Sequence, residues 1–283
     1  MQGRSGKPFA QDPDDRTKCP TSRSQGGPIR NCGDGFPKDS YRTGNHRNVN
    51  VEITSMCLSQ EVSFAASAFL VVGGTYAVTR AWAINRRYLP VALMPVFAGL
   101  QQFMEGNVWW GVNSGDPATT LLGALGFIFF TWFMWPFWIP LASWVLEPPD
   151  SRRRPWMAAM SVAGLAFGLA LYVPHLANPD WVEVTVNQDS LAYEGTMILD
   201  YLMPRWMTYV IYLFLIIAPP AMSTYYHMRW FALTIVGVVV VDILFLRYAY
   251  ISFFCLLAGL GTLHLIYIIA RNKCARECPV LFA

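Results

Sequence analysis

Long apolar runs separated by short polar connections make up the chain from residue 56 onward. Each run is close to the about 17–25 residues that a helix needs to cross a lipid bilayer. Lipid offers no partners to backbone N–H and C=O groups, so runs of this length predict helices rather than barrel strands. The seven predicted spans cover roughly residues 61–80, 89–112, 119–145, 156–175, 205–226, 230–249 and 250–270.

The longest connection, residues 177–204, has a different pattern. It is acidic, and the stretch VEVTVNQDSLAYEG within it alternates between apolar and polar residues. Alternation of this kind is typical of a half-buried strand. The pattern therefore predicts either a short β-hairpin or a segment that lies at the membrane interface.

The third predicted span combines three tryptophans with Pro136 and Pro140 in FFTWFMWPFWIP. Proline frees a backbone carbonyl and kinks a helix, which membrane proteins tolerate where neighbouring groups supply new partners. This segment predicts either a ligand pocket with aromatic walls or aromatic packing around a kink. The Pro219–Pro220 pair in the fifth span leaves the same two alternatives open.

Positive charges are distributed unevenly among the connections, and this asymmetry sets the predicted orientation. Ten lysines and arginines belong to the 1–2, 3–4 and 5–6 connections and the C-terminal tail, whereas the opposite side has only Arg205 and Arg247. The bias predicts a cytoplasmic C-terminus and, with seven spans, an N-terminus outside. The ten residues are Arg80, Arg86, Arg87, Arg152, Arg153, Arg154, Arg229, Arg271, Lys273 and Arg276.

Composition supports membrane insertion. The chain is 54% hydrophobic and 14% charged, whereas soluble domains carry about 25% charged residues. Together with the spans, this predicts an all-α polytopic membrane protein, a seven-transmembrane-helix bundle of the cell membrane with lipid as its partner. No nucleotide motif and no nucleic-acid-binding surface is visible; a protein partner or a homo-oligomer is left open.

The ends of the chain differ from the predicted membrane domain, residues 56–270. Residues 1–55 hold nine Lys/Arg and six Asp/Glu, which accounts for the whole net charge of +3. They are rich in Gly, Pro, Ser and charged residues and have no apolar periodicity, so they predict a disordered extension. Residues 271–283 predict a short basic cytoplasmic tail.

Polar residues inside the spans are the candidate site. A charge at the centre of a membrane helix costs about 2.5–3.5 kcal/mol on insertion scales, so such residues usually face the protein interior. Gln101 and Gln102 precede Glu105 by four and three residues, which places the three side chains on one helical face. Glu105 is suited to bind a cation, to accept a proton or to pair with an arginine. A hydrogen-bonded cluster that joins helices is the alternative.

Three further residues have similar predicted depth. Glu61 begins the first span, Asp242 interrupts the apolar run TIVGVVVVDILFL, and Arg247 follows it. Arg247 is expected either to pair with Glu105 or Glu61 or to extend to the interface. The candidate ligand-binding residues of an outer-half polar cavity are thus Glu105, Gln101, Gln102, Glu61, Asp242 and Arg247.

The positions of the histidines and lysines bear on two kinds of site, a metal centre and a retinal Schiff base. His175 is predicted at the outer end of the fourth span, His227 at the inner end of the fifth and His264 in the inner half of the seventh. They are expected not to converge, and no metal site is predicted. No lysine lies between Lys38 and Lys273. A retinal Schiff base inside a span is therefore excluded, and the chain is not a rhodopsin.

Four segments in this order resemble an uncharacterised family of bacterial multi-span membrane proteins, a domain-of-unknown-function family. They are MCLSQEVSF at 56–64, LPVALMPVFAGLQQFMEGNVW at 89–109, FMWPFWIPLASWVLEPPDSRRR at 133–154 and YAYISFFCLLAGLGTLH at 248–264. The resemblance implies a membrane bundle that begins near Met56. It supplies no activity, no cofactor and no catalytic residue.

Three functions are compatible with these patterns. The first is a bundle that binds or transports a small molecule or ion through the polar cavity around Glu105. The second is a membrane-embedded enzyme of the lipid-hydrolase type, although the clustered histidines of ceramidase-like hydrolases are missing. The third is an accessory or sensor subunit of a membrane complex.

The sequence also generates a prediction about its own start. Residues 1–55 lack the apolar core of a secretory signal, and Met56 opens a segment that reads as a natural N-terminus. We expect N-terminal sequencing of the protein from its native source to begin at Met56. Recovery of residues 1–55 on the mature chain would contradict this.

Overall fold

The computed structural model describes residues 59–187, 190–195, 197–245 and 250–270. The predicted N-terminal extension, Met56, Arg247 and the predicted C-terminal tail lie outside these ranges.

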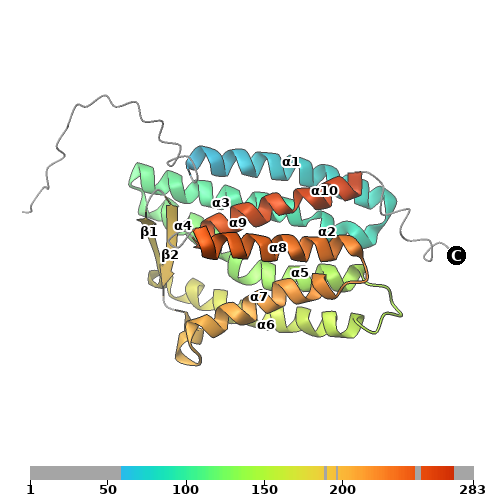
Figure 1. The fold of residues 1–283 in the computed structure, drawn as a ribbon. Helices are drawn as coiled ribbons and strands as arrows, with labels where there is room; N and C mark the ends of the chain where they lie inside the picture. The colour runs from blue at the N-terminus through green and yellow to red at the C-terminus, as the bar shows by residue number, and fades with distance from the viewer. Residues whose placement is uncertain (1–58, 188–189, 196, 246–249, 271–283) are drawn as a thin grey trace, which may run out of the picture. The chain divides into compact units, whose positions relative to one another are not determined.

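Most described residues belong to helices that run back and forth beside one another (Figure 1). Packed pairs include α1 with α3, α3 with α4, α5 with α6 and α7, and α8 with α7 and α9. The long helices are α1 (Gln60–Ile84), α3 (Met94–Ser114), α4 (Pro117–Ile128), α5 (Trp135–Leu146), α6 (Arg154–Ala177), α7 (Arg205–Met222), α8 (Tyr226–Phe245), α9 (Tyr250–Gly261) and α10 (Leu263–Ala270). The short helices are η1 (Arg86–Tyr88), α2 (Leu89–Ala92), the π-helical η2 (Phe129–Met134), η3 (Pro179–Trp181) and η4 (Ile198–Tyr201).

Helices occupy all seven segments in which spans are predicted. Within the described ranges, four helices are long and apolar enough to cross a membrane: Gln60–Ile84, Pro117–Leu146, Arg154–Ala177 and Arg205–Met222. The last predicted span is divided at Thr262, which lies between α9 and α10. The backbone N–H of Thr262 donates to the carbonyls of both Ala258 and Gly259. The mainly helical fold is therefore confirmed, while the count of seven spans stays a prediction.

The third predicted span is a continuous helix with a π-helical segment at its centre, since α4, η2 and α5 follow one another directly. The wide turn lies just before Pro136. Proline has no N–H, and its ring collides with the carbonyl four residues earlier, so an ordinary α-turn is unfavourable there. Segments of this kind are often found at functional sites.

A β-hairpin departs from the all-α expectation. Strands β1 (Val182–Asn187) and β2 (Ser190–Gly195) pair antiparallel, with Val184 opposite Tyr193. The hairpin, one of the two alternatives for this connection, is therefore confirmed. One of its faces is apolar, and Leu191 and Tyr193 are buried against the helices.

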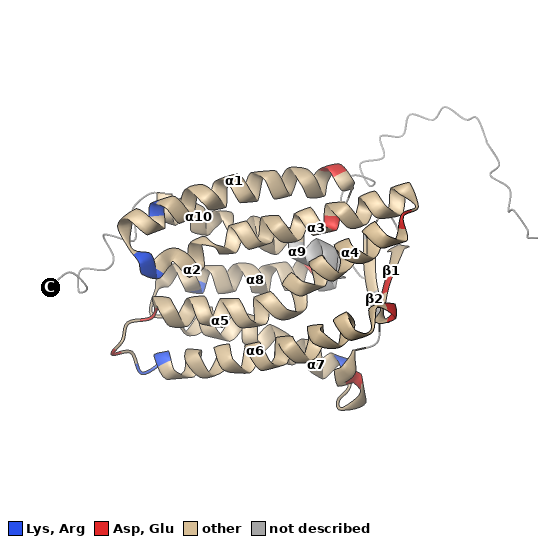
Figure 2. Cartoon of the chain, turned by 180° about the vertical axis from the view of Figure 1, so that it is seen from behind, with Lys and Arg blue, Asp and Glu red and all other residues tan. Residues whose placement is uncertain are grey.

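Charge distinguishes the two ends of the helices. The described arginines other than Arg205 lie where α1 ends and α6 and α8 begin, which we call the arginine end; we call the opposite end, where β1 and β2 lie, the hairpin end (Figure 2). The contact between the rings of Tyr88 and Tyr225, with centroids 6.1 Å apart, joins the connection after α1 to the start of α8.

Helices α5 and α6 lie close together at Gly164. A Cβ atom placed on this glycine would lie 1.9 Å from the carbonyl oxygen of Pro136, far inside van der Waals contact. The small residue therefore permits backbone contact beside the proline that ends the π-helical segment.

We predict that Gly164→Ala separates α5 from α6 and destabilises the protein by about 1–3 kcal/mol or more, as overpacking does. Gly237→Ala is the matched control, because no atom lies within 4 Å of the position that its methyl group would take and alanine favours a helix by about 1 kcal/mol. Thermal unfolding in detergent should show a lower midpoint for Gly164→Ala alone. Equal midpoints for the two variants would contradict the prediction.

Candidate functional site

The polar residues of α3 are buried on one face of the helix. Gln101 and Gln102 are each 1% exposed, and Glu105 is 0% exposed. Their predicted position inside the protein is confirmed. Burying amide and carboxyl groups in an apolar surrounding costs free energy unless they find partners, so the partners determine what each group does.

Gln101 is held at both ends of its amide group. Its Nε2 donates to Oγ1 of Thr131 at 2.8 Å, and its Oε1 accepts from Nε1 of Trp135 at 2.7 Å. Thr131 in turn donates to the carbonyl of Phe127 at 3.1 Å. Since Thr131 lies in η2 and Trp135 begins α5, Gln101 joins α3 to the π-helical segment and fixes the rotation of α3 about its own axis.

Gln102 and Glu105 bond to each other within α3. Nε2 of Gln102 donates to Oε2 of Glu105 at 3.0 Å. Oε1 of Gln102 is buried and has no hydrogen-bond partner among the described residues. This face of α3 therefore presents an amide oxygen beside a carboxylate.

Helix packing brings Ser63 of α1 to the level of Glu105. Gly259 of α9 lies against both Leu70 of α1 and Ala98 of the antiparallel α3. Ser63 precedes Leu70 by seven residues, and Glu105 follows Ala98 by seven. Seven residues make about two helical turns, so both side chains lie about two turns nearer the hairpin end, on the faces that meet α9.

Buried side-chain atoms without partners gather at this level. Oγ of Ser63 (0% exposed) and Nε1 of Trp109, one turn beyond Glu105, lack a hydrogen-bond partner in the described part of the chain, as does Oε1 of Gln102. Buried polar atoms are nearly always hydrogen-bonded, so exceptions require an explanation. We call Ser63, Gln102, Glu105 and Trp109 the α1–α3 polar cluster.

The hairpin end of the bundle is covered by aromatic contacts. Tyr193 of β2 stacks on Phe127 of α4 with ring centroids 4.5 Å apart and planes 10° apart. His175 is 0% exposed; its Nδ1 donates to the carbonyl of Leu171 at 2.8 Å, and its ring lies 4.7 Å from that of Trp132. Trp109 belongs to the same apolar cluster as Tyr193, so this cluster adjoins the α1–α3 polar cluster.

A separate groove of about 310 Å³ lies between the α3–α4 turn and β1. Its lining includes Asp116 and Thr120 but none of the α3 residues Gln101, Gln102 and Glu105. The carboxylate of Asp116 already caps α4, since it accepts from the backbone N–H of Ala118 at 3.0 Å and from Oγ1 of Thr119 at 2.6 Å. The groove is therefore distinct from the polar cluster.

Among protein-family models, that of the family of unknown function DUF6629 matches residues 56–279. The chain belongs to this family. The predicted membership of a family of unknown function is thereby confirmed, and DUF6629 supplies no activity. No curated protein and no solved structure matches the chain.

Of the other three candidate residues of this DUF6629 protein, Glu61 and Asp242 are described and Arg247 is not. Glu61 is exposed in the first turn of α1. Asp242 is 6% exposed, and its Oδ1 has no partner among the described residues. Arg247 is outside those residues, so its pairing with Glu105 or Glu61 stays a prediction.

The expectation that the histidines do not converge is wrong for one pair. The rings of His227 and His264 lie 6.3 Å apart, centroid to centroid. His227 lies in the first turn of α8 and His264 in α10, and these two helices pack against each other at the arginine end. The two histidines are far apart in the sequence, so their contact could not be predicted from spacing. Within the described residues no group of three or more His, Cys, Asp or Glu is placed to hold a metal.

Glu147 is a buried carboxylate that the sequence analysis missed. It is 1% exposed and accepts from Oγ of Ser151 at 2.7 Å, from Oγ of Ser223 at 3.1 Å, and from Thr224 through the backbone N–H at 3.0 Å and the hydroxyl. It joins the α5–α6 connection to the α7–α8 connection, and we call this set the Glu147 clasp. The sequence feature that points to this contact is the Ser223–Thr224 pair before α8. Serine and threonine in that position typically cap a helix, so the pair does not by itself indicate a contact with Glu147.

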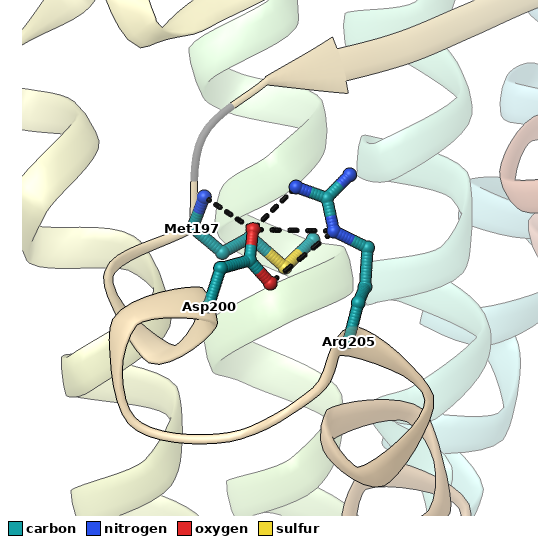
Figure 3. A network of polar contacts seen from close by, with 3 residues as sticks. All are labelled: Met197, Asp200 and Arg205. Atoms are coloured by element: carbon teal, nitrogen blue, oxygen red, sulfur yellow. Dashed lines mark hydrogen bonds and ion pairs between the residues drawn. The ribbon is translucent and has the colours of Figure 1, made fainter. Parts of the chain in front are cut away.

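An ion pair fastens the start of α7 at the hairpin end. Nε of Arg205 donates to Oδ1 and Oδ2 of Asp200 at 3.3 and 3.2 Å, and Nη2 of Arg205 also bonds Oδ2 (Figure 3). The backbone N–H of Met197 donates to the same carboxylate at 3.3 Å. The hydrogen bond from Arg205 holds the pKa of Asp200 below its ordinary value.

This lowered pKa predicts a pH-dependent contribution to stability. A carboxyl whose pKa is lower in the folded state stabilises the protein above its unfolded pKa of about 3.9, and the effect disappears as the pH falls through the folded value. At pH 7 Asp200→Asn should lower stability by about 1 kcal/mol at most, because the pair is partly exposed. The difference between the two unfolding midpoints should shrink as the pH is lowered below about 3.9; a constant difference would contradict the assignment.

Proposed function

We propose that this DUF6629 protein is a seven-span membrane protein that binds a small cation, Na⁺ or a proton, in the α1–α3 polar cluster. The observation that carries the proposal is the position of Glu105, a fully buried carboxylate that lies within about one helical turn of three buried polar atoms that lack partners among the described residues. The site belongs to a bundle that binds or transports an ion or small molecule.

Charge supports the proposed orientation. Among the described residues, arginines gather at the arginine end, and Arg205 alone lies at the hairpin end. By the positive-inside rule the arginine end faces the cytoplasm. Helix α3 runs from the arginine end to the hairpin end, so Glu105, in its second half, lies in the outer half of the proposed membrane domain.

The chemistry of the cluster favours a cation over an anion. The carboxylate of Glu105, the amide oxygen of Gln102 and the hydroxyl of Ser63 are oxygen acceptors, the ligand type that hard cations prefer. The N–H of Trp109 is a donor and suits a water molecule bound to the ion. Gln101 is committed to Thr131 and Trp135, so its role is to position α3.

The experiment compares purified wild type with Glu105→Gln in neutral detergent. We expect the unfolding midpoint of the wild type to be higher in a sodium salt than in the choline salt at the same pH. In the choline salt, we expect it to rise when the pH is lowered. A ligand at about ten times its Kd stabilises by about 1.4 kcal/mol. Glu105→Gln keeps the shape of the side chain but removes the ionisable group, so it should abolish the dependence on both ions.

Glu147→Gln is the matched control, because Glu147 is also a buried carboxylate but has four donors within the clasp. Its loss should lower the midpoint by a similar amount in every salt and leave the ion dependence intact. A wild type that responds to neither Na⁺ nor pH, or a Glu105→Gln variant that still responds, would refute the proposal.

A further inference from the structure

We propose a second site at the arginine end, where Arg153 and Arg229 together bind the phosphate of an anionic phospholipid. This inference rests on the proposed membrane placement but not on ion binding at Glu105. It is carried by the way in which the two arginines, from different segments, are fixed to one short connection.

The two guanidinium groups are attached to consecutive residues of the α7–α8 connection. Nη1 of Arg153, which precedes α6, donates to the carbonyl of Met222 at 3.0 Å. Nε of Arg229, in the first turn of α8, donates to the carbonyl of Ser223 at 2.7 Å. Consecutive residues are only about 3.8 Å apart along the backbone, so the two positive charges are held near each other.

The connection that holds them is itself rigidly fastened. Ser223 and Thr224 both donate to the buried carboxylate of Glu147. Two arginines with fixed positions lose less side-chain freedom when a ligand binds, and this pre-organisation favours affinity. The Glu147 clasp therefore supports the site without contributing a ligand to it.

No acidic side chain neutralises the pair within the described residues. The ion pair found among them, Asp200–Arg205, lies at the opposite end of the bundle. Glu147 is engaged with hydroxyl and amide groups, and Asp150, the other acid of the α5–α6 connection, forms no ion pair with a described residue. Both arginines are exposed and retain free N–H groups, so they present a positive surface.

Phosphate is the ligand that this surface fits. The planar guanidinium group matches the oxygens of a phosphate in paired hydrogen bonds. A lipid rather than a free anion is indicated by the exposed aromatic residues beside the pair, because Tyr226 is 58% and Trp230 45% exposed on α8 next to Arg229. Aromatic rings of this kind lie at membrane interfaces, and anionic lipids attract basic residues on the cytoplasmic side.

The test measures how phosphatidylglycerol and phosphatidylcholine shift the unfolding midpoint of the full-length protein in neutral detergent. We expect phosphatidylglycerol to stabilise the wild type more than phosphatidylcholine does. In Arg153→Gln/Arg229→Gln, the concentration of phosphatidylglycerol for half of the effect should rise about tenfold or more, because both arginine–phosphate interactions are lost. Arg86→Gln/Arg152→Gln removes the same charge from the same end and should respond as the wild type does.

The lysine variant Arg153→Lys/Arg229→Lys keeps the charge but loses the paired geometry, so it decides the question even if the glutamine variant does not fold. It should need more phosphatidylglycerol than the wild type. The proposal is overturned if the glutamine and lysine variants of Arg153 and Arg229 both respond as the wild type does. It is also overturned if the wild type shows no preference between the two lipids. If millimolar inorganic phosphate stabilises the wild type but not the variants, the site binds a free anion, and the proposal of a lipid ligand is overturned. Glu105→Gln should keep the full lipid response, so the two proposals fail separately.

Discussion

The joint at Gln101 determines how the polar face of α3 is used. An amide group buried among apolar helices costs about 1–3 kcal/mol if it is left unpaired. Its two partners, Thr131 and Trp135, lie one turn apart across the π-helical segment. Only one rotation and one height of α3 satisfy both bonds. The directions of Gln102 and Glu105 follow from that choice, because they share the face that Gln101 fixes.

Two buried carboxylates illustrate the difference between a structural acid and a candidate ligand. Glu147 accepts from three hydroxyl groups and one backbone N–H, all from two connections that it joins. Glu105 accepts from Gln102, one turn earlier in the same helix, at 3.0 Å. The neighbouring Oε1 of Gln102 is left without a partner among the described residues. Burial alone does not separate the two roles; the unpartnered acceptor beside Glu105 distinguishes it from Glu147.

The sequence predicted what depends on local pattern and missed what depends on contacts between distant residues. The apolar runs have the length of membrane helices, and the alternation in VEVTVNQDSLAYEG is that of a strand, so helices and hairpin were both predictable. The spacing of Gln101, Gln102 and Glu105 likewise predicted one buried face. The partners of Gln101 lie 30 and 34 residues away, and those of Glu147 on the α7–α8 connection 76 and 77 away. Helical periodicity contains no information about such pairs.

The two proposed sites have opposite chemistry, and distance makes them nearly independent. The cluster around Glu105 contributes the oxygen acceptors of Gln102 and Ser63, whereas Arg153 and Arg229 present N–H donors. Glu105 follows the start of α3 by eleven residues, which corresponds to about 16 Å along the helix. At an effective dielectric constant of about 20, two unit charges at that distance interact by about 1 kcal/mol. Each site must therefore draw its affinity from its own neighbours: the buried acceptors in one case, and the arginines held by the Glu147 clasp in the other.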